Sequence, residues 1–250
     1  MQSLREILEQ HDGRLINKWE NYLEVYDTFF SRYRGKEIVF LEIGVAHGGS
    51  LQMWRKFFGE KALLIGVDID PNCKQFEEEN TKVFIGSQED EKFLNYLKTQ
   101  IPKVDILLDD GGHTMKQQIT TFNVLFDHVK ENGLYACEDL HTSYQKHFAG
   151  GYKKKGTFIE FSKNFIDNLH GWHQGVSNKN KMFNHITKTV FGLHYYDSIL
   201  IIEKRIIKEP KNLFVGKKHL KEVFQTSSQQ NFLIEKTEWF FKNVKRKLFK

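Results

Sequence analysis

Apolar residues in this chain fall into two alternating patterns. Short, nearly continuous apolar runs, typical of strands buried on both faces, occur at 37–43, 62–68, 82–85, 104–108 and 134–137. Between them, apolar residues recur every three or four positions, which predicts helices at 50–58, 73–80, 91–100 and 115–129. Crossovers between parallel strands need such helices. The chain is therefore predicted to be an α/β protein with a Rossmann-like, doubly wound, mostly parallel sheet.

The pattern changes at both ends of this region. Residues 1–34 have helical spacing throughout, so we predict N-terminal helices there. Residues 140–186 contain no clear strand and include a helical stretch at 158–172. They form an insertion after the fifth strand.

Two β-type runs follow, at 189–196 and 199–204. Only Asp197 and Ser198 separate them, which predicts a tight antiparallel hairpin. A parallel sheet that ends in such a hairpin disfavours a plain dinucleotide dehydrogenase. We place a single domain at 1–205 and a C-terminal extension at 206–250.

Composition and cysteine content indicate an intracellular protein. The chain has 250 residues, of which 40% are hydrophobic, enough for one sizeable core. Cys73 and Cys137 form no C-x-x-C motif, which suits a reducing cytosol. The first twelve residues have no signal-peptide pattern, and no run approaches the ~18 apolar residues of a membrane helix. We expect a cytoplasmic homo-oligomer.

The net charge of +5 is concentrated at the C-terminal end. Residues 236–250 hold six lysines and arginines against Glu238, so the rest of the chain is formally neutral and nucleic-acid binding is not implied. Apolar residues at helical spacing, including Val244 and Leu248, lie between these lysines. The segment could contact an anionic membrane, which would place the protein at the periphery of the inner membrane. It could also pack on a partner subunit or stay frayed.

Polar residues follow the first three predicted strands, at the sheet edge where ligands bind in open α/β proteins. The first strand ends in the glycine-rich loop 42–50, in which Glu42 precedes Gly44, Gly48 and Ser50. An acid there suits a cationic ligand such as S-adenosylmethionine better than a pyrophosphate, and the glycine spacing is not that of NAD proteins. Asp68 can accept ribose hydroxyls, and Gln88 in the loop 86–90 can bond to an adenine edge.

The fourth and fifth strands end in acids. Asp109 and Asp110 precede His113, while Glu138 and Asp139 close the next strand. Clustered carboxylates repel each other, and a divalent cation such as Mg²⁺, or Mn²⁺ or Fe²⁺, resolves the conflict. Such a cation could lower the pKa of a substrate hydroxyl, whose proton His113 could then accept.

Several of these residues have structural alternatives. Asp109, a candidate for cofactor binding, could instead cap the turn or bond to the backbone. His141 could be a packing residue. The pair His170 and His173 has no third ligand, so we interpret it as a surface pair, and His47 as a loop residue.

The block FLEIGVAHGGSLQMW…GVDIDP…GSQED…DILLDDGGHTMKQQ…ACEDLHTSY resembles class I S-adenosylmethionine-dependent methyltransferases. Within them it is similar to the metal-dependent sugar O-methyltransferases related to macrocin and mycinamicin O-methyltransferases, from about residue 18 to 204. The D-D-G-x-H and E-D-x-x-T-x-Y segments carry the specific part of this resemblance, whereas the glycine loop is generic.

This resemblance implies a set of site residues. Glu42, Gly44 and Gly48 would hold the methionine part of S-adenosylmethionine, and Asp68 its ribose. Asp110, Glu138 and Asp139 would hold Mg²⁺, with His113 as the base. The family's further metal ligand, from an upstream segment, has no counterpart that we can place in this chain.

The resemblance also implies the substrate class, a sugar hydroxyl in polysaccharide or natural-product glycoside biosynthesis. The insertion at about 140–186 would then be a substrate lid. His141, Tyr144 and Tyr152 are candidate contacts to the sugar, and so are Trp172 and His173; core packing is the alternative for Trp172. The alternative functions are methylation of a non-sugar small molecule, such as a phenol, and a non-catalytic nucleotide-binding protein of the same fold.

Overall fold

A computed structural model describes residues 2–173, 181–217 and 219 of the chain. The chain divides into two units between Glu209 and Pro210. The basic segment 236–250 lies outside the described residues. In the part of the chain that is described, no helix combines the length and the apolar character that crossing a membrane requires.

The first unit is built on one seven-stranded sheet with the strand order β3-β2-β1-β4-β5-β7-β6. Strands β1 to β5 run parallel, and β7 pairs antiparallel with both β5 and β6. The predicted sheet and its terminal hairpin are confirmed. The strands are β1 (Val39–Ile43), β2 (Leu63–Asp68), β3 (Thr81–Ile85), β4 (Val104–Asp109), β5 (Val129–Cys137), β6 (Val190–Tyr196) and β7 (Ile199–Lys204).

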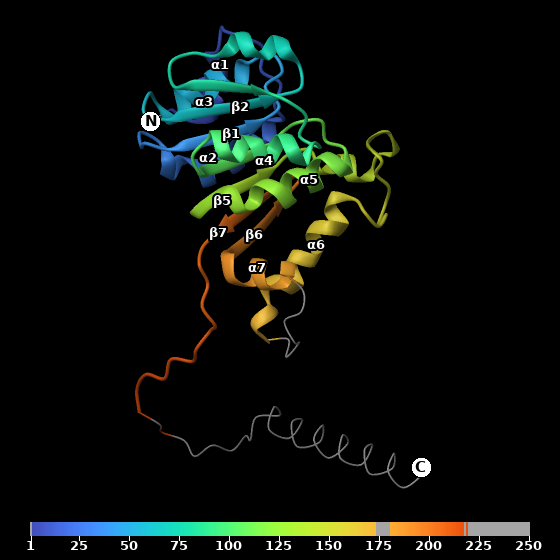
Figure 1. The fold of residues 1–250 in the computed structure, drawn as a ribbon. Helices are drawn as coiled ribbons and strands as arrows, with labels where there is room; N and C mark the ends of the chain where they lie inside the picture. Colours follow the sequence, from blue (N-terminus) through green and yellow to red (C-terminus); the bar gives the residue numbers. More distant parts are fainter. Residues whose placement is uncertain (1, 174–180, 218, 220–250) are drawn as a thin grey trace, which may run out of the picture. The chain divides into compact units, whose positions relative to one another are not determined.

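Helices cover both faces of this sheet, with α4 and α5 in front of it in Figure 1. The α-helices are α1 (Leu4–Glu9), α2 (Glu20–Phe30), α3 (Gly49–Phe58), α4 (Glu91–Gln100), α5 (Met115–Leu125), α6 (Phe158–Leu169) and α7 (Lys181–Thr189). Short 3₁₀ turns are η1 (Ser31–Tyr33), η2 (Pro71–Phe76), η3 (Phe126–His128), η4 (Leu140–Tyr144), η5 (Lys146–Phe148) and η6 (Gly171–His173). The helix predicted at 73–80 is wrong, because only η2 forms there.

Alternate residues of each strand supply two separate apolar layers. Phe40, Leu64 and Ile106 point to one face and pack with apolar residues of α1, α2 and α3. Their neighbours Leu41, Ile65 and Leu107 belong to the other layer, with residues of α4, α5, α6 and α7. Because both faces are covered, the strands are apolar on both sides, which is why they read as continuous runs.

The continuous helix pattern predicted for 1–34 is wrong in one respect that concerns the site. Residues 10–19, between α1 and α2, are not helical. This segment, which we call the N-terminal strap, passes the first turn of α3. Gln52 accepts a hydrogen bond from the backbone of Arg14 at 2.8 Å, and the Arg14 guanidinium pairs with Glu78 at 2.7 Å. These contacts fix the strap at the carboxyl ends of the strands.

Candidate active site

Two adjoining cavities of about 230 Å³ each lie at the carboxyl ends of the parallel strands. They share Gly44, Ala46, Asp110 and Gly111, so together they form one two-lobed cleft. The first lobe extends to the N-terminal strap and to the acids after β5, and the second to Asp68 and Gln88. This cleft lies at the edge where the sequence predicts a cofactor.

The glycine loop is shaped by close backbone packing. Gly44 has φ +96°, and a Cβ there would collide with the carbonyl of Asp110. Asp68 holds the loop from the other side, because its Oδ2 accepts hydrogen bonds from the amides of Val45 and Ala46, both at 2.9 Å. The loop is therefore fixed before any ligand arrives, with Gly48 at the start of α3.

Of two predicted cofactor residues, Asp109 lies beneath the cleft and Gln88 lines its second lobe. Asp109 lines neither lobe; it is 1% exposed and accepts a hydrogen bond from Gln88 Nε2 at 2.9 Å. Gln88 also donates to Thr121 at 3.1 Å and accepts from the amide of Gly112 at 2.7 Å. These contacts occupy the side-chain amide of Gln88. In this structure the amide therefore positions the loop 111–112 and does not offer its polar atoms to an adenine edge.

Glu42 is equally enclosed. It is fully buried and accepts hydrogen bonds from Ser50 Oγ at 2.6 Å and Trp54 Nε1 at 3.1 Å. The ammonium that it faces is that of Lys18, at 3.6 Å. Ser50 lines the first lobe, whereas Glu42 itself does not. The predicted acid at the end of β1 thus has a partner within the protein.

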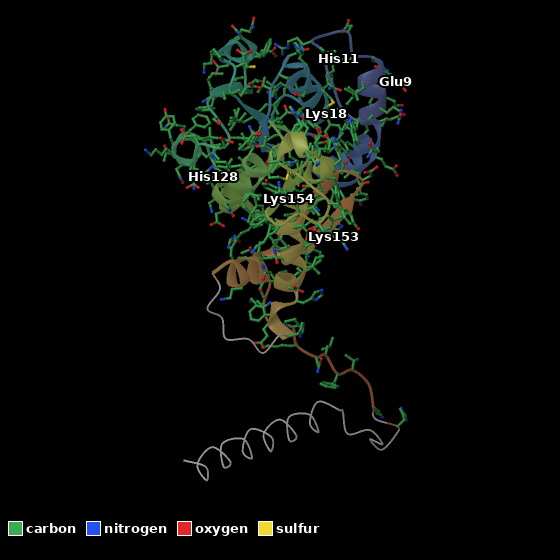
Figure 2. The ribbon with its side chains drawn as sticks, turned by 90° about the vertical axis from the view of Figure 1, so that its right-hand side faces the viewer. Glu9, His11, Lys18, His128, Lys153 and Lys154 are labelled. Carbon is green, nitrogen blue, oxygen red and sulfur yellow. The ribbon has the colours of Figure 1, made fainter. Side chains whose placement is uncertain are left out.

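Lys18, labelled in Figure 2, is the central cation of the site. Its side chain is 2% exposed, and its Nζ donates to Asp110 and to Glu138, the latter at 2.7 Å. Burial alone would lower the pKa of Lys18, but the surrounding carboxylates outweigh it and raise that pKa well above its usual value. The Lys18 ammonium therefore forms ion pairs with acids at the ends of three strands, β1, β4 and β5.

The carboxylates still outnumber this ammonium. Glu138, which also accepts a hydrogen bond from Tyr26, has its pKa raised to about 8 by burial and then by the charge of Asp110, with Lys18 acting in the opposite direction. Burial likewise raises the pKa of Asp110 to about 7, again against Lys18. Negative charge remains incompletely balanced here, which favours a further cation.

A three-ligand cluster lies on the far side of Asp110. Asp110, His113 and Asp139 each offer one ligand atom, and these atoms lie within 4.8 Å of one another. His113 Nε2 is 3.3 Å from Asp139 Oδ2 and 3.9 Å from Asp110 Oδ1. The two carboxylate oxygens suit a divalent cation. The imidazole nitrogen beside them can complete the ligand set or accept a proton, but its single lone pair cannot do both at once. Glu138, predicted as a ligand, is turned toward Lys18 and Tyr26 and is not part of this cluster.

Two residues of the cluster have an unusual backbone conformation. His113 and Asp139 both have left-handed conformations, with φ of 57° and 56°. Tyr22 stabilises the second by donating to Asp139 Oδ1 at 2.8 Å, and Thr142 Oγ1 donates to the carbonyl of His113 at 3.0 Å. Such conformations cost about 1–3 kcal/mol each and are concentrated at functional sites.

The imidazole of His113 is suited to accept a proton. Burial lowers the pKa of His113, although Asp139 opposes the effect, so the ring is neutral at neutral pH. Its Nδ1 is buried and has no hydrogen-bond partner among the described residues. Nε2, by contrast, faces the carboxylates that would hold a cation and its bound hydroxyl.

The predicted sugar contacts lie beside this centre. His141 stacks on Trp19 with ring centroids 4.5 Å apart, and its Nδ1 is 4.0 Å from Asp139 Oδ1. Tyr144 and Tyr152 are exposed, with ring centroids 6.4 Å apart. Trp172 instead donates to the carbonyl of Thr187 at 3.2 Å, which favours the packing alternative for that residue.

The other histidines that the sequence singles out lie outside the cluster. His170 and His173 are both exposed, and His47 lies on the exposed part of the glycine loop. The interpretation of the first two as a surface pair remains the simplest one.

Comparison with known proteins shows which family of proteins the chain is similar to. Residues 41–140 match the family described as methyltransferase domain. The chain is 33% identical over 199 residues to 8-demethyl-8-alpha-L-rhamnosyl tetracenomycin-C 2'-O-methyltransferase of Streptomyces olivaceus, covering 76% of this chain and 52% of that protein. It is 34% identical over 209 residues to demethylmacrocin O-methyltransferase of Streptomyces fradiae, covering 78% and 52%.

A solved structure agrees with these relatives. The MycE methyltransferase from the mycinamycin biosynthetic pathway, in complex with Mg and SAH, superposes with a TM-score of 0.75 at 28% identity, over 82% of this chain and 55% of that one. The chain thus spans about half the length of the relatives that it matches.

Proposed function

The chain carries a methyltransferase domain of the class I, S-adenosylmethionine-dependent type, and from this premise we propose that it transfers a methyl group from S-adenosylmethionine to a sugar hydroxyl with the help of a divalent cation. The observation that carries the proposal is the cluster of Asp110, His113 and Asp139 at the mouth of a cleft with a preformed glycine loop. The fold that carries this cleft is similar to that of a methyltransferase whose structure contains Mg and SAH.

The residues fit the two groups in separate places. The cleft over Gly44 and Asp68 would hold the cofactor, which supplies an electrophilic methyl group. Asp110 and Asp139 would hold the cation, which lowers the pKa of a bound hydroxyl. Lys18 binds Glu42 and Glu138 and holds them away from that cation.

His113 then completes the reaction. As the sugar oxygen forms its bond to the methyl carbon and the carbon–sulfur bond breaks, the hydroxyl proton passes to Nε2 of His113. Lowering of the pKa of His113 by burial keeps this nitrogen unprotonated beforehand. Asp139 faces Nε2 at 3.3 Å and would stabilise the imidazolium that forms.

A sugar acceptor is supported by the relatives. The first of those named above is, by its printed name, an O-methyltransferase of a rhamnosyl compound. The second, and mycinamicin VI 2''-O-methyltransferase of Micromonospora griseorubida at 33% identity, are O-methyltransferases by their names. A screen of sugar glycosides and phenols with labelled S-adenosylmethionine separates a sugar acceptor from a non-sugar one. Transfer to phenols alone would replace the acceptor in this proposal.

Removal of the metal tests the catalytic part. We expect EDTA to abolish methyl transfer and added Mg²⁺ or Mn²⁺ to restore it, while S-adenosylhomocysteine still binds by calorimetry, because the cofactor and the cation use different side chains. Full turnover in EDTA would contradict the metal-dependent mechanism. Failure of S-adenosylhomocysteine to bind would contradict the assignment of the cleft.

Substitution of Gly49 by alanine tests the role of the N-terminal strap. A Cβ at Gly49 would collide with the carbonyls of Arg14 and Leu15, so the strap would be pushed away from the first lobe that it lines. We expect roughly tenfold weaker S-adenosylhomocysteine binding by calorimetry. Gly151→Ala is the control, because there the nearest atoms belong to the flexible side chain of Lys154. Unchanged affinity in Gly49→Ala would show that the strap does not shape the cofactor site.

A further inference from the structure

Trp19, the last residue of the N-terminal strap, is an unusual residue for its position. It is the N-cap of α2, where Ser, Thr, Asp or Asn usually accepts hydrogen bonds from the first free amides of the helix. An indole has no acceptor, and Trp19 makes no side-chain cap hydrogen bond. Local preferences of this kind are broken most often at functional sites, which points to a role for the indole outside the helix.

Core packing does not account for this indole either. Trp19 is 43% exposed and belongs to neither of the two apolar layers of the sheet. It lines the first lobe of the cleft, together with His113 and Asp139. The role of the ring therefore lies in its contacts at the reaction centre.

The indole of Trp19 stacks on two rings that come from different elements. Its centroid is 4.5 Å from that of His141 in η4, with an angle of 20° between the planes. It is 5.7 Å from the centroid of Tyr22 in α2, with an angle of 21°. Both separations are favourable for stacked aromatic rings. Trp19 thus joins the end of the strap to the turn that follows β5.

Both stacking partners lie against one carboxylate oxygen, Oδ1 of Asp139. The hydroxyl of Tyr22 donates to this oxygen at 2.8 Å and accepts from the amide of Asp139 at 3.3 Å. His141 Nδ1 is 4.0 Å from the same oxygen. The second oxygen, Oδ2, is 3.3 Å from His113 Nε2. Oδ1 is therefore engaged by the protein, and Oδ2 is left to face the reaction centre.

The direction of the Asp139 carboxylate depends on where the Tyr22 ring lies. One hydroxyl of Tyr22 contacts both the amide and the carboxylate of Asp139, a residue in the left-handed conformation between β5 and η4. The Tyr22 side chain is buried, with 1% exposed, and Trp19 covers its ring on the side of the cleft. Removal of the indole would open this side of Tyr22 and leave His141 without its stacking partner.

We propose that Trp19 is a positioning residue of the reaction centre. By stacking on Tyr22 and His141, it holds the carboxylate of Asp139 with Oδ1 toward Tyr22 and Oδ2 toward His113 and the cation. This inference rests on the proposed function and adds to it a residue that acts on the cation through Asp139. Trp19 itself offers no ligand atom.

The affinity for Mn²⁺ tests this role without requiring turnover. Each variant of the full chain is saturated with S-adenosylhomocysteine, its folding is checked by circular dichroism, and free Mn²⁺ is measured by electron paramagnetic resonance during a titration. We expect Trp19→Ala to bind Mn²⁺ about tenfold more weakly, as is usual when a group that orients a metal ligand is lost. Trp19→Phe should stay within about threefold of the unsubstituted chain, because a phenyl ring can still stack on both partners.

Two further variants separate stacking from bulk. Trp19→Leu keeps an apolar side chain without a flat face, and we expect it to lose Mn²⁺ affinity as Trp19→Ala does. If Trp19→Ala does not fold, the comparison of Trp19→Leu with Trp19→Phe carries the test. Tyr96→Ala is the control, since Tyr96 is an aromatic residue of α4 that is 56% exposed and lines neither lobe of the cleft.

A double-mutant cycle tests whether the indole acts through the Tyr22 hydroxyl. Tyr22→Phe removes the hydroxyl and keeps the ring, so it should weaken Mn²⁺ binding by itself. The loss in the double variant Trp19→Ala/Tyr22→Phe should be clearly smaller than the product of the two single losses, because both substitutions release the same carboxylate.

Four results would overturn the inference while the unsubstituted chain binds Mn²⁺. They are unchanged affinity in Trp19→Ala, equal affinities in Trp19→Leu and Trp19→Phe, a double variant whose loss equals the product of the single losses, and an equal loss in Tyr96→Ala. Failure of the unsubstituted chain to bind Mn²⁺ would instead contradict the proposed function itself.

Discussion

Replacement of His113 by glutamine is expected to lower kcat by about a hundredfold to ten-thousandfold, the usual contribution of a positioned general base. Glutamine retains the size and polarity of the side chain but accepts no proton at neutral pH. Calorimetry should show S-adenosylhomocysteine affinity unchanged, because His113 contributes to the acceptor side of the cleft. His170→Gln is the control, since His170 is exposed and outside the cluster.

The dependence of kcat on pH in the unsubstituted enzyme also tests whether His113 is the base. Burial lowers the pKa of His113, so its neutral form persists to a lower pH than that of a free imidazole. The base is lost only when the pH falls below that lowered value, and kcat should decline there. A His113→Gln enzyme with nearly full activity, or one that keeps the same acidic decline, would show that another group takes the proton.

Replacement of Lys18 by methionine is expected to destabilise the metal-free protein by about 3–5 kcal/mol near pH 8, the usual cost of breaking a buried ion pair. Glu42, Asp110 and Glu138 would then lie buried without the ammonium that they share. Denaturant unfolding followed by circular dichroism measures this change. Lys116→Met is the control, because Lys116 pairs with Glu89 on the surface, where such pairs contribute little.

The destabilisation should depend on pH and on metal in defined directions. The pKa values of Asp110 and Glu138, about 7 and about 8, lie above their ordinary values, so the folded state binds more protons than the unfolded state. Their contribution to stability is thus present at low pH and is lost as the pH rises through 7 to 8. We expect Lys18→Met to be closer to the unsubstituted protein at pH 5 than at pH 8, and Mg²⁺ to stabilise the variant more than the unsubstituted chain. A loss of stability independent of both would contradict the role given to Lys18.

The fold could be predicted from the sequence because the apolar pattern of each strand shows whether the strand is covered on one face or on both. A strand such as β2 is apolar at nearly every position, and that pattern is visible without knowing its neighbours. Boundaries were less certain where local and tertiary preferences compete. At 71–76 the chain forms only a 3₁₀ turn, which begins at Pro71 with Asp70 as its cap.

The acids and the base of the candidate site could also be proposed from the sequence, because parallel strands bring their ends to one edge. Lys18 could not. It lies 92 residues from Asp110 and 120 from Glu138, in a stretch whose apolar spacing resembled helix. Tyr22 and Tyr26 fit the apolar spacing of α2, and that spacing does not show that their hydroxyls bond to Asp139 and Glu138. The useful signal would have been the charge balance, since four clustered acids require a cation and the protein can supply one itself.

The arrangement of these cations is tested most directly by a crystal structure with S-adenosylhomocysteine and Mn²⁺, with data collected at the manganese absorption edge. We predict one anomalous peak between Asp110 and Asp139, with His113 beside it and Lys18 still between Glu42 and Glu138. A peak at the position of the Lys18 ammonium, or no peak near Asp110 and Asp139, would contradict the account.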